Sequence, residues 1–402
     1  MIFWEDKKTE RKLLQLLAFF LCGILLTVLF TGCINQGQKS VVSTETVLSE
    51  APLDHPSFLP NWSDEAYHDY FGTTEMLNGF NEKYPDLINV FSIGKSVLGK
   101  DIWCIKVTNE KNYTIKSSCL IDGCIHGAEW EGGEACLYLA EYLLINFDAN
   151  ETITHILNSS EVYIIPLVNP DGRQADSRYN DNGINLNRNF NVDFGRIRGY
   201  AIPLGKLFGR IKIPILPFSW SREFTLLHKL FPSFPLWIEN CGRRPFSEPE
   251  TQAVRDLMRE LENNDFSFYL NCHTAGLVLF SPWDAFKPPF EIPKQEQYIY
   301  DYVKEWFVRN TEYNKRENEN IGHWISGSAE DWCFKEFRIP SFAVDFLPFD
   351  YDPGVGGGKH DHLVHWMETT LPVFMYLLVN IDNLRQWETP DIQPLLPEVV
   401  PP

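Results

Sequence analysis

Two residues that can bind a metal lie three positions apart, just before a predicted helix. His126 and Glu129 follow an apolar run, residues 117–123, that is typical of a buried strand, and Leu, Ala and Tyr recur at helical spacing over residues 135–147. Ligands bind at the carboxyl ends of strands in open α/β sheets, so both side chains can face one cation there. Taken alone, a His-x-x-Glu pair also fits a surface or helix-capping role.

A third candidate ligand lies at the end of another predicted strand. Catalytic zinc takes three protein ligands and keeps a fourth position for water. His273 ends the β-like run 266–272 and is followed by Thr, Ala and Gly. His273 is therefore the candidate for the third ligand of a site that His126 and Glu129 would begin.

Length and composition favour one large α/β domain, although two smaller ones would also fit. The chain has 402 residues, of which 44% are hydrophobic, and a net charge of −19, which argues against nucleic acid as a partner. Strands that alternate with helices predict a mixed, mostly parallel sheet with helices on both faces. Predicted strands cover 87–93, 101–107, 117–123, 161–168, 266–272 and 341–347, and predicted helices cover 65–85, 130–147, 248–263, 294–309 and 362–383.

The N-terminal segment has the pattern of a targeting signal. Basic residues precede an apolar run, residues 13–30, and Phe-Thr-Gly-Cys33 then resembles the lipobox of prokaryotic lipoproteins. That resemblance implies removal of the signal and a lipid on Cys33, whereas an uncleaved membrane anchor over residues 1–33 is the alternative. Either interpretation predicts an extracytoplasmic protein tethered to a membrane through residues 34–64.

The remaining chain is interpreted as one domain, 65–385, and a Pro-rich tail, 386–402. Within the domain, residues 195–237 form a Pro-rich, apolar insert with seven Lys and Arg against one acid. Such an insert suits an anionic membrane surface, a lid or a loop packed on the acidic domain. The seven cysteines after Cys33 are expected to be buried small hydrophobic residues first and disulfide partners second.

The motifs, in their order, resemble those of the zinc metallocarboxypeptidases of the carboxypeptidase A and B type. The resemblance covers roughly residues 65–380, and it implies that His126, Glu129 and His273 hold one zinc ion per chain. The two-His, one-Glu set is an established ligand set for that family. The motifs are Tyr84-Pro-Asp, His126-x-x-Glu129, Asn169-Pro-Asp-Gly172, Asn187-Arg-Asn-Phe190, Pro245-Phe-Ser-Glu-Pro-Glu250, His273-Thr-x-Gly and Ser326-Gly-x-x-x-Asp-Trp332.

The resemblance also implies roles for three polar residues between the ligands. Arg178 matches the arginine that stabilises the oxyanion, and its alternative role is that of a solvated loop residue. Asn187 and Arg188 match the pair that grips the terminal carboxylate of the substrate. This grip restricts such enzymes to chain ends, although Arg188 would also fit a structural salt bridge.

Three positions depart from the family pattern. Asp345 stands where the family has a glutamate as general base, so its carboxylate sits one methylene further back. His323 stands where a tyrosine closes over substrate, and Trp324 is an alternative cover. Glu330 occupies the position that sets side-chain preference, where an acid would favour Lys or Arg, unless it faces solvent.

The resulting functional prediction is an extracytoplasmic zinc carboxypeptidase. It would remove C-terminal residues from peptides with a free carboxylate, by attack of a zinc-activated water that Asp345 deprotonates. One alternative is a zinc amidase acting on cell-wall or other non-standard amide bonds. Another is an inactive zinc-containing binding protein on the same scaffold, since Asp replaces Glu.

Overall fold

A mixed β-sheet forms the centre of the computed structural model, which describes residues 59, 62–63, 67–194, 240–283, 291–311, 326–346 and 363–394. The described strands lie in the order β1-β2-β4-β3-β5-β7-β6. They are β1 (Ile88–Lys95), β2 (Asp101–Val107), β3 (Ser117–Gly123), β4 (Ser160–Ile165), β5 (Phe266–Thr274), β6 (Val278–Phe280) and β7 (Ser341–Phe346).

The parallel part of the sheet is its centre. Strands β4, β3, β5 and β7 run parallel, whereas β1, β2 and β6 are joined by antiparallel pairing at the two edges. The mixed α/β fold predicted from the sequence is thereby confirmed. The predicted hairpin is present too, because β1 and β2 pair antiparallel across the turn at residues 96–100.

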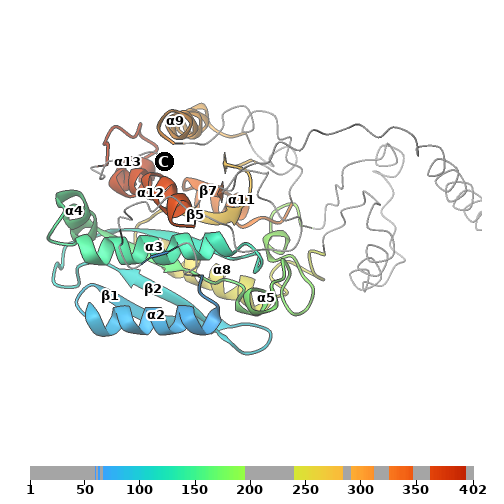
Figure 1. The fold of residues 1–402 in the computed structure, drawn as a ribbon. Coiled ribbons are helices and arrows are strands. Elements are labelled where there is room, and N and C mark those ends of the chain that lie inside the picture. Colours follow the sequence, from blue (N-terminus) through green and yellow to red (C-terminus); the bar gives the residue numbers. More distant parts are fainter. Residues whose placement is uncertain are drawn as a thin grey trace, which may run out of the picture. The chain divides into compact units, whose positions relative to one another are not determined.

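Helices cover both faces of the sheet (Figure 1). Side chains of β3 alternate between two cores: Cys119 and Ile121 pack with α3 and α12 on one face, and Leu120 packs with α8 and α11 on the other. The described helices are α2 (Tyr70–Lys83), α3 (Trp130–Asn146), α4 (Glu151–Ser159), α5 (Pro170–Ala175), the 3₁₀ helix η1 (Leu186–Arg188), α8 (Pro249–Glu262), α9 (Lys294–Asn310), α11 (Ala329–Phe337), α12 (Leu363–Val379) and α13 (Ile381–Arg385).

The first turn of α3 lies unusually close to the ends of β3 and β5. A Cβ atom added to Gly132 would lie 2.5 Å from the carbonyl oxygen of Cys272, and one added to Gly123 would lie 2.3 Å from the carbonyl oxygen of Gly132. Only glycine permits this approach without displacing backbone. The approach brings the start of α3, and hence Glu129, next to the end of β5.

The C-terminal part differs from its prediction. The single helix expected over 362–383 is α12 followed by α13, with Asn380 between them, and the Asn380 side chain bonds both the Tyr376 carbonyl and the backbone of Ile392. The start of the predicted tail packs on the domain, since the ring of Trp387 lies 5.4 Å from that of Tyr300. Local sequence did not reveal either contact because both depend on tertiary packing.

Several predictions fall outside the described residues. They concern Cys33, the apolar run 13–30, the insert 195–237 and His323. Within the described part of the chain, no helix has the length and apolar character needed to span a membrane. The cysteines of that part are buried, as predicted, except for the half-buried Cys241, and no disulfide links any of them.

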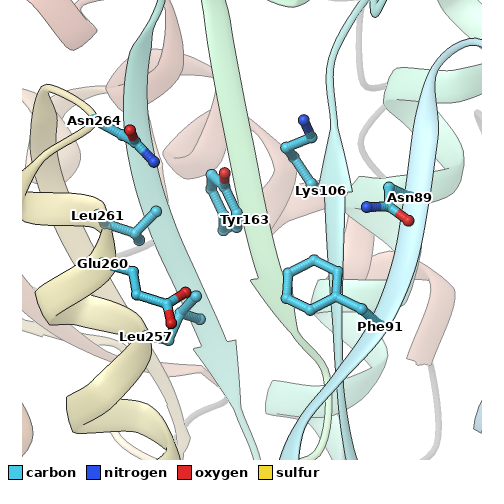
Figure 2. A pocket seen from close by; sticks show the side chains of 8 residues that line it. All are labelled: Asn89, Phe91, Lys106, Tyr163, Leu257, Glu260, Leu261 and Asn264. Atoms are coloured by element: carbon cyan, nitrogen blue, oxygen red, sulfur yellow. The ribbon is translucent and has the colours of Figure 1, made fainter.

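A hollow of about 200 Å³ lies between α8 and strands β1, β2 and β4 (Figure 2). The ammonium group of Lys106, which lines it, already pairs with Glu110 at 2.7 Å. None of the predicted site residues lines this hollow, so the chemistry indicated by the sequence lies elsewhere. Its lining residues are Asn89, Phe91, Lys106, Tyr163, Leu257, Glu260, Leu261 and Asn264.

Candidate metal centre

The three predicted ligands come together in one cluster. One potential ligand atom from each of His126, Glu129 and His273 lies within 4.8 Å of the other two. Nδ1 of His126 lies 2.8 Å from Oε1 of Glu129, and Nδ1 of His273 lies 2.8 Å from Oε2 of the same carboxylate. The two Nδ1 atoms are 3.2 Å apart. Three donor atoms therefore converge on one point.

The register of two parallel strands explains this convergence. Gly123 at the end of β3 is the neighbour of Cys272 on β5, so the chain after β3 and His273 emerge at the same edge of the sheet. Residues 124–129 then turn into α3, with Cys124 at a positive φ of 51°. Glu129 occupies the N-cap of α3, where the helix dipole favours a carboxylate.

The buried charges of the cluster shift the acidity of its members. Burial lowers the pKa of His126 to about 4, with a further contribution from Arg178, and this keeps its imidazole neutral. Burial raises the pKa of the Glu129 carboxyl, but His126 and His273 outweigh it and hold that pKa well below the usual range. Burial opposes protonation of His273, yet Glu129 and Asp345 raise its pKa above the ordinary value.

The chemistry of these donors fits zinc. Two imidazoles and one carboxylate form the ligand set of many catalytic zinc sites, and each ligand must bind in its deprotonated form. The neutral His126 and the ionised Glu129 meet that requirement. The zinc ion predicted from the sequence would be held by His126, Glu129 and His273.

Asn185 is a residue of the site that the sequence analysis missed. Its Oδ1 lies 3.0 Å from Nε2 of His126, so it accepts the proton on that nitrogen and leaves Nδ1 for a metal. An asparagine alone does not mark a metal site in a sequence. The one sequence feature that could have pointed to Asn185 is its place two residues before the predicted clamp residue Asn187, in Asn185-Leu-Asn187. The predicted clamp residue Asn187 is also close, with Nδ2 lying 3.2 Å from Nε2 of His273 and Oδ1 accepting from the Ala329 amide.

Arg178 and Asp345 flank the cluster. Arg178 donates from Nη1 to Oε1 of Glu129 at 2.6 Å, so its guanidinium lies within reach of any group bound beside the ligands. Asp345 on β7 is the register partner of His273 on β5. Burial raises the pKa of Asp345 to about 7, with a smaller opposing contribution from His273.

The other two predicted substrate-binding residues occupy different surroundings. Arg188 is half-buried and donates to the Asn187 carbonyl at 2.7 Å, which places it beside the cluster. Glu330 lies on α11 and is 1% exposed, so the alternative of a solvent-facing glutamate is wrong. Its Oε2 has no hydrogen-bond partner among the residues that the structure describes. Its charge acts on both His273 and Asp345.

Comparisons with known proteins agree with this architecture. Human carboxypeptidase A6 is 24% identical over 310 residues, which cover 73% of this chain and 63% of that protein. The chain thus spans less than two thirds of the length of this relative.

Solved structures agree on the fold. The carboxypeptidase A structure from Helicoverpa armigera has a TM-score of 0.59 at 19% identity and covers 81% of this chain and 75% of its own. Bovine thrombin-activatable fibrinolysis inhibitor, solved with a tick carboxypeptidase inhibitor, has a TM-score of 0.60 at 20% identity over 80% of this chain and 99% of its own. The family model described as zinc carboxypeptidase matches residues 73–353, and the chain belongs to that family.

Proposed function

We propose that this chain is a metallocarboxypeptidase that hydrolyses the last peptide bond of peptides with a free C-terminal carboxylate. The observation that carries the proposal is the convergence of His126, Glu129 and His273, with Arg178 at 2.6 Å from Glu129. Family membership supports the same activity. A binding protein would not need a donor and a carboxylate on either side of a metal cluster.

Each flanking residue has a distinct task in this reaction. A zinc ion in the cluster would acidify a water molecule and polarise the scissile carbonyl. Asp345 accepts a proton from the attacking water and returns it to the leaving amine. Arg178 donates to the oxygen on which negative charge develops, a contribution typically of about 100- to 1,000-fold in rate.

Arg188 and Asn187 are assigned to the terminal carboxylate of the substrate. A guanidinium can donate two parallel hydrogen bonds to a carboxylate, which fixes orientation as well as charge. Arg188 lies next to Asn187 along η1 (Leu186–Arg188), and the Asn187 amide is itself held against His273 at 3.2 Å. This arrangement keeps a carboxylate bound by Arg188 close to the metal cluster, so only the last peptide bond would reach it.

The proposal includes a preference for Lys or Arg as the released residue. Glu330 supports it, because its buried Oε2 has no hydrogen-bond partner in the described part of the chain and an unpaired buried carboxylate oxygen is costly. Asp122 Oδ1 and both polar side-chain atoms of Asn271 are likewise buried and have no hydrogen-bond partner among the described residues. Asp122 and Asn271 are register neighbours on β3 and β5, and α11, which carries Glu330, packs against β5. A cationic substrate side chain could donate to the oxygen atoms of this group, Oε2 of Glu330, Oδ1 of Asp122 and Oδ1 of Asn271.

The location is part of the proposal as well. Cys33 with its preceding apolar run supports an extracytoplasmic enzyme tethered to the membrane, through a lipid or through an uncleaved anchor. Peptides that reach the outer face of that membrane would then be its substrates.

The test uses residues 35–402 loaded with zinc and a panel of blocked dipeptides ending in Arg, Lys, Phe, Leu or Glu. We expect release of the terminal residue that a chelator abolishes, and faster release of Arg and Lys. No release from any substrate, with one zinc bound per chain, contradicts the proposed activity. Release of Phe or Leu in preference to Arg and Lys contradicts only the specificity.

Glu330→Gln tests the specificity directly, with Glu336→Gln as a matched control. Both glutamates lie on α11, but Glu330 is buried and Glu336 is exposed. Loss of a charged hydrogen bond should lower kcat/KM for the Arg and Lys substrates by about 10- to 100-fold in Glu330→Gln. The control should leave every substrate unchanged.

A further inference from the structure

The segment that carries Arg178 has neither helical nor strand structure. It follows α5 and contains a turn that Asn180 closes: the Asn180 amide donates to the Ile184 carbonyl at 3.0 Å, and the Ile184 amide donates to Oδ1 of Asn180 at 3.0 Å. Gly183 adds a bond to the Asn180 carbonyl at 2.8 Å and has a positive φ of 71°. Asn180 thus determines the shape of the chain two residues beyond Arg178.

The remaining polar atom of Asn180 binds two carboxylates at once. Its Nδ2 lies 2.8 Å from Oε2 of Glu248 and 3.2 Å from Oε2 of Glu250. Asn180, Glu248 and Glu250 are 4%, 5% and 0% exposed. A charge-assisted hydrogen bond in such a dry environment is stronger and more directional than one at the surface.

The two carboxylates are themselves fixed by other parts of the fold. Oε1 of Glu250 accepts from the Val97 amide at 3.0 Å, in the turn between β1 and β2. Oε1 of Glu248 accepts from the Ser247 hydroxyl at 2.6 Å. Glu248 is the N-cap of α8 and Glu250 lies in its first turn, where the helix dipole partly offsets two buried negative charges.

Two buried like charges at one amide nitrogen are a costly way to hold an ordinary loop. Burial raises the pKa of Glu250, and the charge of Glu248 raises it further. Arg178 lies two residues before Asn180 in the chain, and its Nη1 lies 2.6 Å from Oε1 of the predicted ligand Glu129. Rigid placement of the arginine gives the arrangement a use, because a misplacement of about 1 Å can cost on the order of 100-fold in rate.

We propose that Glu248 and Glu250 are positioning residues for Arg178 and that they act through Asn180. This role accounts for the Pro245–Glu250 motif, which the reaction itself does not use. The inference rests on the proposed carboxypeptidase activity, in which Arg178 stabilises the developing oxyanion.

Asn180→Asp is the informative variant, with Asn182→Asp as its matched control. Asp keeps the size of Asn180 and the oxygen that accepts from Ile184, but it places a carboxylate oxygen against Glu248 and Glu250. Asn182 is exposed and donates to the same Oε2 of Glu248 at 2.8 Å, whereas the bond to Glu250 in the described part of the chain comes from Asn180. Both variants add the same charge to the same loop.

The experiment combines each variant with Arg178→Ala in a double-mutant cycle on the best dipeptide substrate. In the wild-type background, Asn180→Asp should lower kcat about 10- to 100-fold with little change in KM or zinc content, and Asn182→Asp should lower it less than about threefold. In the Arg178→Ala background, Asn180→Asp should cost less than about twofold, because its target is already absent. An equal loss in both backgrounds overturns the proposal.

Amide hydrogen exchange over residues 177–184 provides a readout that needs no catalysis. Exchange there should accelerate at least about tenfold in Asn180→Asp and stay near wild type in Asn182→Asp. If the wild type hydrolyses no dipeptide, the proposed function has failed, and exchange still decides whether Asn180 holds the segment of Arg178. Unchanged exchange in Asn180→Asp overturns the inference in either case.

Discussion

Oδ1 of Asn185 lies 3.0 Å from Nε2 of His126, on the side of the ring opposite the metal cluster. The same oxygen accepts from the Asn187 amide at 3.0 Å, so its direction is fixed from two sides. Asn185 is fully buried, and its Nδ2 has no hydrogen-bond partner within the described ranges of the chain. The residue therefore serves to orient His126 at the cost of an unsatisfied donor of its own.

Removal of this contact should weaken zinc binding. In Asn185→Ala, His126 loses the acceptor that holds its tautomer and its plane, and we expect the zinc affinity to fall by about 10- to 100-fold. Competition with a chromophoric chelator measures the affinity. Asn185→Asp keeps an acceptor and removes the unsatisfied amide nitrogen, so it should bind zinc at least as tightly as the wild type. Equal affinities for Asn185→Ala and the wild type would disprove the assignment.

Asp345 gives a prediction about catalysis alone. Asp345→Asn keeps the size of the side chain but cannot accept the proton of the attacking water, so kcat should fall about 100- to 10,000-fold while zinc content stays at one per chain. Asp345→Glu keeps a carboxylate and should retain far more activity than Asp345→Asn. Stopped or continuous assays with a dipeptide substrate measure both. Full activity in Asp345→Asn would show that this carboxylate is structural.

Much of the fold was predictable because the central strands carry a strong local pattern. The apolar run 117–123 matches β3 residue for residue, and Asp101–Val107 matches β2, since both strands are buried along most of their length. The places of His126, Glu129 and His273 after such strands made them candidate ligands, and the resemblance to zinc carboxypeptidases implied the full ligand set. The register between β3 and β5 supplies what the sequence lacks, namely that the two ends are neighbours.

The supporting residues of the site were harder to predict. Asn180 and Asn185 matter through contacts with residues 68 and 59 positions away in the chain, Glu248 and His126. Polar residues in a loop have no periodicity, so only the fold reveals which of them are buried and aimed at a partner. The Asn380 break between α12 and α13 was missed for the same reason, because its partner is the backbone near Ile392.

Asp122 should make stability depend on pH. Burial raises its pKa to about 7 in the folded protein, although Tyr269 donates to it at 2.8 Å, whereas an unfolded aspartate titrates near about 3.9. The folded state therefore binds the proton of the Asp122 carboxyl more tightly than the unfolded state does. The resulting stabilisation is complete below about pH 4 and is lost as the pH rises through about 7.

Asp122→Asn imitates the protonated carboxyl and isolates this contribution. Urea unfolding of the zinc-free protein at pH 5 gives a reference value for the difference in unfolding free energy between variant and wild type. At this pH the folded wild type still has Asp122 largely protonated, so the difference should be small. At pH 8 the variant should gain on the order of 2 to 4 kcal/mol relative to wild type, since one pKa unit corresponds to about 1.4 kcal/mol. If the difference in unfolding free energy between Asp122→Asn and wild type is the same at pH 5 and pH 8, the Asp122 carboxyl has an ordinary pKa. His273 and Glu330 also act on Asp122, and both are kept in the variant.

The ion pair of Glu134 with Arg173 should be essential for stability. Both side chains are fully buried, and the Glu134 carboxylate also accepts from the His68 amide at 2.8 Å. Arg173 in turn donates to the His68 carbonyl and stacks on Trp130, 3.7 Å from the ring centre. Glu134→Gln leaves a buried guanidinium without its counter-charge, and breaking such a pair typically costs about 3 to 5 kcal/mol.

The matched control for this pair is Glu305→Gln on α9. Glu305 pairs with Arg309 at 2.9 Å, but the arginine side chain is 71% exposed. Loss of this ion pair in Glu305→Gln should therefore lower the free energy of unfolding by no more than about 0.5 kcal/mol. Urea unfolding at pH 7 measures both variants, with the wild type as reference. Because the Glu134 network joins the residues before α2 to α3 and α5, its loss should also expose Trp62 and Trp130 to solvent, which tryptophan fluorescence detects. A loss in Glu134→Gln as small as that in Glu305→Gln would mean that water or another group satisfies Arg173.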